Sequence, residues 1–132
     1  MTRHEDLKPI NPPHWKRPSG YSNGMLGGGF LFIAGQIGWD ENGAFAEGLV
    51  DQVRHALLNI RAVAEAADAR VDRIARLTWY VTDRQAYKAQ TREIGAVYRE
   101  IIGRHFPAMA VVEVKGLVED KALVEIEATL VL

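Results

Sequence analysis

The sequence predicts an α+β fold with the order β-β-α-β-α-β-β, in which one mixed sheet carries two helices on one face. Two segments place apolar residues three or four positions apart, and the segments around them alternate apolar and polar residues or form short apolar runs. The chain has 132 residues, a length typical of one domain around one hydrophobic core. We therefore expect residues 1–132 to form a single domain.

The first half of the chain predicts an arm, a hairpin and a helix. Residues 1–20 hold four of the five prolines and predict an extended N-terminal arm. After Tyr21, a short strand, the glycines at 27–29 and a strand from Phe30 to Ile37 predict a β-hairpin. Between Glu47 and Ala67, apolar residues recur at helical spacing with charged residues on the opposite face, which predicts a helix.

The second half predicts a strand, a second helix and two final strands. Residues 73–82 alternate in the manner of a strand, and Asp83 is placed to cap a helix that continues to about Gly103. Residues 108–114 and 123–132 predict the last two strands, which are apolar on both faces. Because two helices can cover only one face of a sheet, we expect the open face to be buried in a homo-oligomer.

Composition and charge exclude several classes of function. With 16 basic and 17 acidic residues, the net charge of −1 predicts no nucleic-acid partner and no anionic membrane partner. The chain has no cysteine, which excludes disulfides, thiolate catalysis and cysteine-based metal sites. The longest apolar run, Phe30 to Ala34, is far shorter than the roughly 20 residues of a membrane-spanning helix. We therefore expect a cytoplasmic protein.

The histidines predict no metal site. None of the four is at metal-ligand spacing from another, and they are His4, His14, His55 and His105.

The clearest polar feature is the segment VEIEA, which contains Glu125 and Glu127. Residues two apart in a strand point to the same side, so the two carboxylates share a face. A carboxylate with restricted solvation has a raised pKa and can activate a water molecule near neutral pH. Two solvated glutamates without a role are the alternative, and this is the commoner situation for acidic residues.

Two other features bear on ligand binding. The segment HWKRPSGY groups Trp15, Lys16, Arg17 and Tyr21, which can stack on an aromatic ligand or neutralise an acidic one, or form plain solvated surface. Gly95 lies inside the second predicted helix, where glycine costs about 1 kcal/mol relative to alanine, so close packing or a ligand is the reason for it.

Six segments resemble the RidA/YjgF family in their order along the chain, and the likeness covers nearly everything from Tyr21 onward. They are SGYSNG, IAGQIGWD, DQVRHALLNIRAVAEAA, RIARLTWYVTD, AVYREIIGRHFPA and VEVKGLVEDKALVEIEA. The resemblance implies a chorismate-mutase-like fold, a homotrimer and clefts at the subunit interfaces. It also implies hydrolysis of reactive enamines and imines, such as 2-aminoacrylate, to a ketoacid and ammonia without any cofactor.

The resemblance implies roles for particular residues. Glu125 matches the family's water-handling glutamate, and Tyr21 matches its pocket tyrosine. In the deaminases an arginine follows the PA pair and binds the substrate carboxylate through two contacts, and here that position is Met109. The pocket cysteine corresponds to Val111 and the helix asparagine to Gly95.

Further residues complete the expected binding site. The backbone around Gly35 and Gln36 is expected to supply donors or acceptors to the substrate, and Arg17 or Lys16 from the arm is a candidate partner for its carboxylate. Methionine in place of arginine indicates an apolar pocket with extra room.

The function expected from the sequence is a cofactor-free hydrolytic deaminase of an enamine or imine that is larger or more aromatic-derived than 2-aminoacrylate. Its expected partners are this small-molecule substrate and other copies of itself. The alternative is a non-catalytic trimer that binds a small metabolite in the same cleft. An endoribonuclease, suggested by older family naming, is a third reading, and the neutral charge and the absence of a basic stripe with stacking aromatics count against it.

Overall fold

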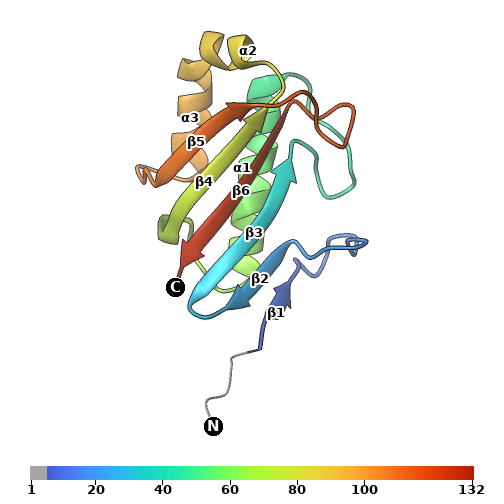
Figure 1. Ribbon diagram of the computed structural model, residues 1–132, viewed down its shortest axis with the longest axis vertical. Helices are drawn as coiled ribbons and strands as arrows, with labels where there is room; N and C mark the ends of the chain where they lie inside the picture. The colour runs from blue at the N-terminus through green and yellow to red at the C-terminus, as the bar shows by residue number, and fades with distance from the viewer. Residues whose placement is uncertain (1–5) are drawn as a thin grey trace.

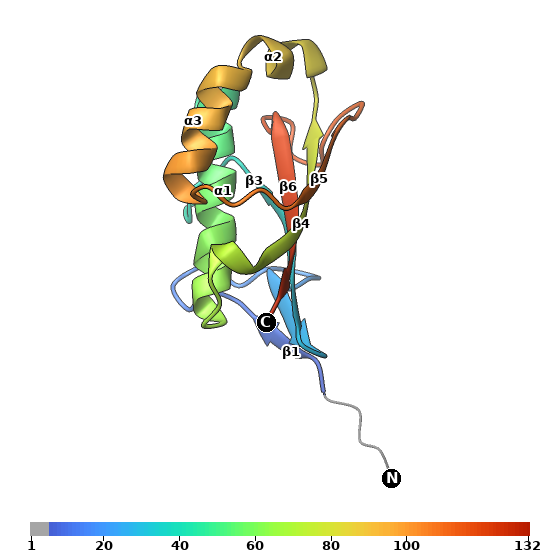
Figure 2. The ribbon, with the colours of Figure 1, turned by 90° about the vertical axis from the view of Figure 1, so that its left-hand side faces the viewer.

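One six-stranded sheet forms one layer of the molecule and the helices form the other, as Figures 1 and 2 show. The computed structural model describes residues 6–132, so the first five residues of the arm, including His4, lie outside the described residues. The strand order across the sheet is β1-β2-β3-β6-β4-β5. Only β4 and β5 run parallel, and all other neighbours are antiparallel, which confirms the mixed sheet.

The elements follow the expected order, with small shifts at their ends. The strands are β1 (Lys8–Ile10), β2 (Gly24–Gly27), β3 (Phe30–Ile37), β4 (Ile74–Val81), β5 (Ala108–Glu113) and β6 (Val124–Val131). The helices are α1 (Leu49–Ala66), α2 (Arg84–Ala89) and α3 (Thr91–Ile101), and a 3₁₀ turn, η1 (Val71–Arg73), precedes β4.

Two features correct the expected element list. The arm contains a strand that was not expected, because β1 pairs with β2 at the edge of the sheet. Three residues are too few for an alternating pattern, so the sequence carried no visible sign of this strand. The expected second helix is two helices, because Gln90 leaves the helical conformation at φ −122° and ψ 20°. The apolar spacing continues across this break, which is why one helix was expected. Asp83 does cap the first of them by accepting from two backbone amides.

The hairpin between β2 and β3 turns at Gly28 and Gly29, whose φ angles are 62° and 84°. A two-residue turn of this kind needs positive φ at both positions, which glycine adopts without strain. The turn fixes the register of β3 and so places the irregular end of that strand beside β6.

Helices α1 and α3 cover one face of the sheet, as Figure 2 shows edge-on. The core lies in this layer and includes Leu57 and Ile60 of α1, Trp79 of β4 and Ile126 of β6, all at most 2% exposed. Deleting a fully buried side chain of this size typically costs about 2–5 kcal/mol, so the positions of β4 and β6 are strongly determined. Residues between the buried ones on these strands point to the other face.

The open face of the sheet is only partly apolar. Four large apolar side chains are exposed there, namely Phe30, Phe32, Val112 and Val131. The middle of the face is polar, because β6 places Glu125, Glu127 and Thr129 on it. The exposed apolar area is therefore split around a polar centre.

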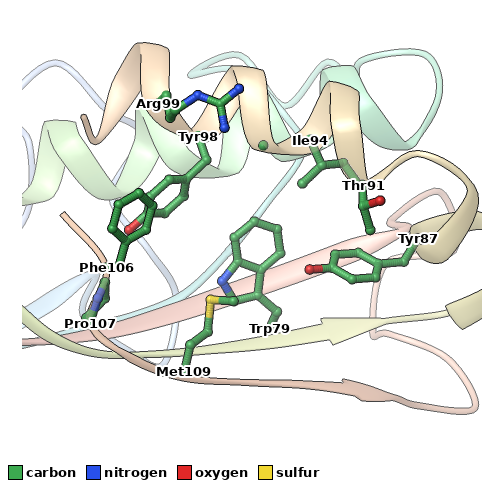
Figure 3. A pocket seen from close by; sticks show the side chains of 10 residues that line it. Trp79, Tyr87, Thr91, Ile94, Tyr98, Arg99, Phe106, Pro107 and Met109 are labelled. Carbon is green, nitrogen blue, oxygen red and sulfur yellow. The ribbon is translucent and has the colours of Figure 1, made fainter. Parts of the chain in front are cut away.

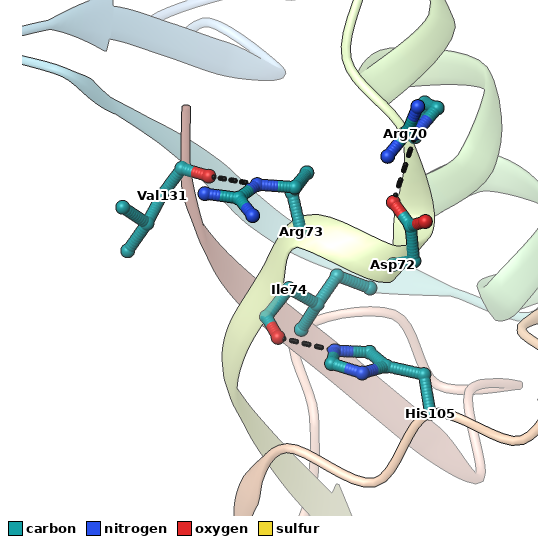
Figure 4. A network of polar contacts seen from close by, with 6 residues as sticks. All are labelled: Arg70, Asp72, Arg73, Ile74, His105 and Val131. Atoms are coloured by element: carbon teal, nitrogen blue, oxygen red, sulfur yellow. Dashed lines mark hydrogen bonds and ion pairs between the residues drawn. The ribbon is translucent and has the colours of Figure 1, made fainter.

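The segments at the start of β4 and before β5 are tied together by side-chain contacts to backbone carbonyls (Figure 4). The His105 Nε2 atom lies 2.6 Å from the Ile74 carbonyl oxygen, and Arg73 donates from Nε to the Val131 carbonyl oxygen at 2.9 Å. The Tyr98 hydroxyl donates to the His105 carbonyl oxygen at 2.5 Å. The two contacts made by His105 hold the loop that carries Phe106 in place.

Within residues 6–132, no helix has both the length and the hydropathy needed to cross a bilayer.

Candidate functional site

A groove of about 860 Å³ lies where the arm, β3 and the start of β6 meet. Three groups of residues and Asn59 of α1 line it. The groups are the arm, the irregular end of β3 with the loop after it, and the loop before β6 with the first residues of that strand. Among the lining residues are Arg17, Tyr21, Gly35, Gln36 and Glu125. The structure therefore brings five of the eight expected site residues together in one place.

A bulge in β3 makes room for the Glu125 carboxylate. The register of β3 against β6 shifts between Ile33 and Gln36, which leaves Ala34 and Gly35 outside regular pairing. A Cβ atom at Gly35 would lie 2.7 Å from the Glu125 Cδ and Oε2 atoms. Glycine at this position is therefore needed for Glu125 to rest against the backbone of β3.

Glu125 sits in an environment that favours its protonated form. Burial raises the pKa of Glu125 above its ordinary value, and the neighbouring charge of Glu127 raises it further. Glu127 accepts a hydrogen bond of 2.6 Å from the Tyr80 hydroxyl, and this bond is the main cause of a raised Tyr80 pKa. The expectation that the two carboxylates share one face is confirmed, and only Glu127 has a hydrogen-bond partner among the described side chains.

The Gln36 side chain supports the bulge from inside. It is buried, and its Nε2 atom donates to the Ala34 carbonyl oxygen at 3.0 Å and to Asn23 Oδ1 at 3.3 Å. Asn23 is held in turn by Asn11, whose Oδ1 atom accepts from the backbone and side chain of Asn23. The side-chain amide nitrogen of Gln36 is thus engaged within the protein, and this chain of contacts joins the arm to the bulge.

A second, smaller cavity of about 200 Å³ lies between α3 and the strands β4 and β5 (Figure 3). Met109 and Gly95 both line it. Most of the other walls are aromatic or apolar: Trp79, Tyr87, Ile94, Tyr98, Phe106 and Pro107. Met109 faces this cavity because it pairs in register with Leu77, which points toward the helices.

The expected site residues are therefore divided between two places within one chain. Glu125, Tyr21, Gly35, Gln36 and Arg17 line the groove, whereas Met109 and Gly95 line the cavity. Val111 lines neither, because it is half-buried and packs against the core beside its register partner Trp79. Met109 and Glu125 also point to opposite faces of the sheet.

The sequence reasoning missed Arg99 and Phe106 and interpreted Trp79 as a packing residue. Trp79 is buried as expected, but it also forms a wall of the cavity. Arg99 lies four residues after Gly95, and residues four apart share one face of a helix. That spacing could have placed Arg99 beside the glycine. No pattern in the sequence placed the loop residue Phe106 against α3.

Residues 6–132 contain no group of three or more histidine, cysteine, aspartate or glutamate side chains able to hold a metal ion.

Comparison with known proteins identifies the family. A model of the family described as Endoribonuclease L-PSP, which is the RidA/YjgF family, matches residues 15–132. The chain belongs to the RidA/YjgF family. The solved structure of a conserved Rid family protein from Yersinia pestis superposes on this RidA/YjgF chain with a TM-score of 0.84 and 28% identity, covering 96% of this chain and 100% of that one.

Two relatives are similar to this RidA/YjgF chain over most of its length. A RutC family protein of Pyrococcus horikoshii is 38% identical over 123 residues, which cover 92% of this chain and 87% of the relative. A 2-iminobutanoate/2-iminopropanoate deaminase of Salmonella typhimurium is 35% identical over 112 residues, covering 82% of this chain and 84% of that enzyme. The RidA/YjgF family thus includes a deaminase of small imino acids.

Proposed function

We propose that this protein is a cofactor-free hydrolytic deaminase that converts an imine, or the enamine in equilibrium with it, to a carbonyl compound and ammonia. The observation that carries the proposal is a half-buried Glu125 with a raised pKa, resting on a glycine bulge at the wall of a large groove. A carboxylate with these properties is suited to take a proton from water and return it near neutral pH.

The reaction needs one water and no other reactant. Glu125 takes a proton from the water as its oxygen attacks the imine carbon, and the electrons of the carbon–nitrogen double bond move to nitrogen. The protonated carboxyl gives this proton to nitrogen, which forms an amino alcohol. The carboxylate then takes the remaining hydroxyl proton and passes it to the same nitrogen, so the carbon–nitrogen bond breaks, the carbonyl forms and ammonia leaves. Tyr21, which lines the same groove, is proposed to orient the substrate.

The proposed enzyme is a homotrimer whose active site spans two copies. Met109 and Glu125 lie on opposite faces of the sheet, so one copy does not bring them to the same ligand. A neighbouring copy packed on the open face through Phe30 and Phe32 could place its own cavity beside the groove. We expect this oligomer to work in the cytoplasm without a nucleic-acid or membrane partner.

The proposed substrate is larger or more apolar than a three-carbon imino acid. Met109 offers a thioether where the family deaminases have an arginine, and the walls around it are mainly aromatic. Methionine packs well against rings and fills irregular space, which favours an apolar or aromatic substituent on the imine.

The test compares Glu125→Gln with Glu127→Gln in a turnover assay. The imine is generated in situ from phenylalanine by an amino-acid oxidase with catalase, and the acceleration of its hydrolysis is measured. Loss of general acid–base catalysis is worth about a hundredfold or more, so Glu125→Gln should fall to background. Glu127→Gln should remain active. The acidic limb of its pH–rate profile should lie at lower pH than that of the native protein, because removing the Glu127 charge lowers the Glu125 pKa.

Other outcomes would select another function. Full turnover by Glu125→Gln would remove the assigned role of this residue. No acceleration by the native protein with either 2-iminobutanoate or the aromatic imine, together with saturable binding of the product ketoacid, would favour a non-catalytic binding protein. RNA cleavage that persists in Glu125→Gln after further purification would favour the endoribonuclease reading.

A further inference from the structure

The small cavity holds several polar groups that have no partner in the described part of the chain. The Arg99 guanidinium makes no ion pair or hydrogen bond with the described residues. The Tyr87 hydroxyl also lacks a hydrogen-bond partner there, and Figure 3 shows it pointing across the cavity toward Trp79. Trp79 Nε1 is fully buried and unpartnered among these residues. Each of these groups can donate a hydrogen bond.

A buried donor without an acceptor is uncommon and costs about 1–3 kcal/mol. Figure 3 shows the Trp79 ring nitrogen on the side that faces the Met109 sulfur, and a thioether is only a weak acceptor. Because this nitrogen is fully buried, it lies behind the cavity wall, and the donors open to a ligand are the Tyr87 hydroxyl and the Arg99 guanidinium. These two donors match a ligand that carries acceptor atoms.

Gly95 gives Arg99 its place on the cavity rim. A Cβ atom at Gly95 would lie 3.3 Å from Arg99 Nη1, so the guanidinium reaches back along the helix to the glycine. A larger side chain at position 95 would compete for this space. The absence of a side chain at 95 and the reach of Arg99 are therefore linked.

The size and the walls of the cavity fit a flat apolar group. Its volume is about 200 Å³, and an apolar cavity of about 150 Å³ is sufficient to bind benzene. The rings of Trp79, Tyr87 and Phe106 supply surfaces on which an aromatic group can stack or pack edge-on. Arg99 is exposed at the rim, where it can meet a charged group that projects from the ring toward solvent.

We infer that this cavity binds the aromatic or flat apolar group of the substrate and that Arg99 at its rim binds the substrate carboxylate. The partner of the carboxylate would thus lie on helix α3 and not at the β5 position that Met109 occupies. This inference rests on the proposed function for the identity of the reacting imine. Its ligand chemistry, an aromatic carboxylate, is tested separately by binding.

The test is calorimetric titration of the intact protein with phenylpyruvate, the ketoacid product of the aromatic imine, and with phenylacetone, in which a methyl group replaces the carboxylate. Losing a charge-assisted contact costs about tenfold to a hundredfold in affinity. Arg99→Gln should weaken the binding of phenylpyruvate by at least tenfold and leave the affinity for phenylacetone unchanged. The control Arg92→Gln removes an exposed arginine of the same helix that does not line the cavity, and both affinities should stay within twofold.

A second variant tests the link between Gly95 and Arg99. Gly95→Asn should weaken the binding of phenylpyruvate because the new side chain displaces the Arg99 guanidinium. The double variant with Arg99→Gln should bind phenylpyruvate about as weakly as Arg99→Gln alone. Equal phenylpyruvate affinity in the native protein and Arg99→Gln, or no binding of phenylpyruvate by the native protein, would overturn the inference.

The two proposals fail in distinguishable ways. If phenylpyruvate binds through Arg99 but the aromatic imine is not hydrolysed, the cavity assignment holds and the deaminase proposal fails. If the imine is hydrolysed as fast by Arg99→Gln as by the native protein, with an unchanged KM, the cavity assignment fails and the deaminase proposal holds.

Discussion

The groove and the cavity differ in the chemistry of their walls. The groove is built at a strand bulge and is lined by Glu125, which can exchange a proton, and by the basic residues Lys16 and Arg17 of the arm. The cavity is built between a helix and two strands and is lined by aromatic rings and unpartnered donors. Proton transfer is therefore expected in one region and ligand recognition in the other, and a substrate that uses both must lie between two copies.

The largest effect is expected from separating the copies. Phe32→Asp places a charge on the open face, where the native side chain is 47% exposed, and should dissociate the proposed homotrimer. Turnover should fall by at least a hundredfold because groove and cavity no longer meet, while circular dichroism stays native. Sedimentation velocity and the imine assay check this.

The control for this variant is Gln85→Asp, which adds the same charge at an exposed position of α2 and should change neither size nor rate. A monomeric Phe32→Asp protein with native turnover would show that one copy contains the whole active site.

The next effect comes from the groove alone. Gly35→Ala places a methyl group 2.7 Å from the resting Glu125 carboxylate and forces it to move. Turnover should fall by about tenfold or more, since a displaced base loses its alignment with water. Phenylpyruvate affinity should be unchanged, because the cavity is not touched.

Gly116→Ala is the matched control, because a Cβ atom there meets no atom within 4 Å. If Gly35→Ala keeps native turnover, the bulge does not position Glu125.

The cavity alone is changed by Met109→Arg. The new guanidinium would fill apolar space and offer a strand-side partner to a carboxylate, so aromatic imines should lose about tenfold in kcat/KM and 2-iminobutanoate should gain about tenfold. Met109→Leu keeps the apolar character and should preserve the order of substrates. Improvement with both substrates would mean that Met109 does not select for size.

The smallest effect is on stability and concerns Glu125. Its pKa is raised in the folded protein, so the folded state holds this proton more tightly than the unfolded state and loses stability as the pH rises through that range. Glu125→Gln should therefore raise the melting temperature at pH 7, and the gain should disappear below pH 4, where both forms are uncharged. A lower melting temperature at pH 7 would contradict the burial of this charge.

The regular elements could be predicted because their periodicity is local. Asp83 caps a helix and Glu125 and Glu127 share a strand face, as their spacing indicated. Strand β1 could not be predicted, because three residues carry no pattern and the partner strand is distant in sequence.

The sequence named candidate site residues, but it did not show that they divide between two places in one chain. The family resemblance pointed to Met109 and Glu125, but their separation follows from the registers of β5 and β6 against β4, the strand that lies between them. Arg99 was not expected, because its importance depends on a glycine one turn earlier and on a loop that brings Phe106 to the same cavity.

The most direct measurement follows turnover and phenylpyruvate affinity in the same Glu125→Gln preparation. If the groove performs the chemistry and the cavity holds the ligand, turnover disappears and phenylpyruvate binds at least as tightly as to the native protein, since the variant lacks one negative charge. Native turnover, or affinity weakened tenfold or more, would contradict this division between the two regions.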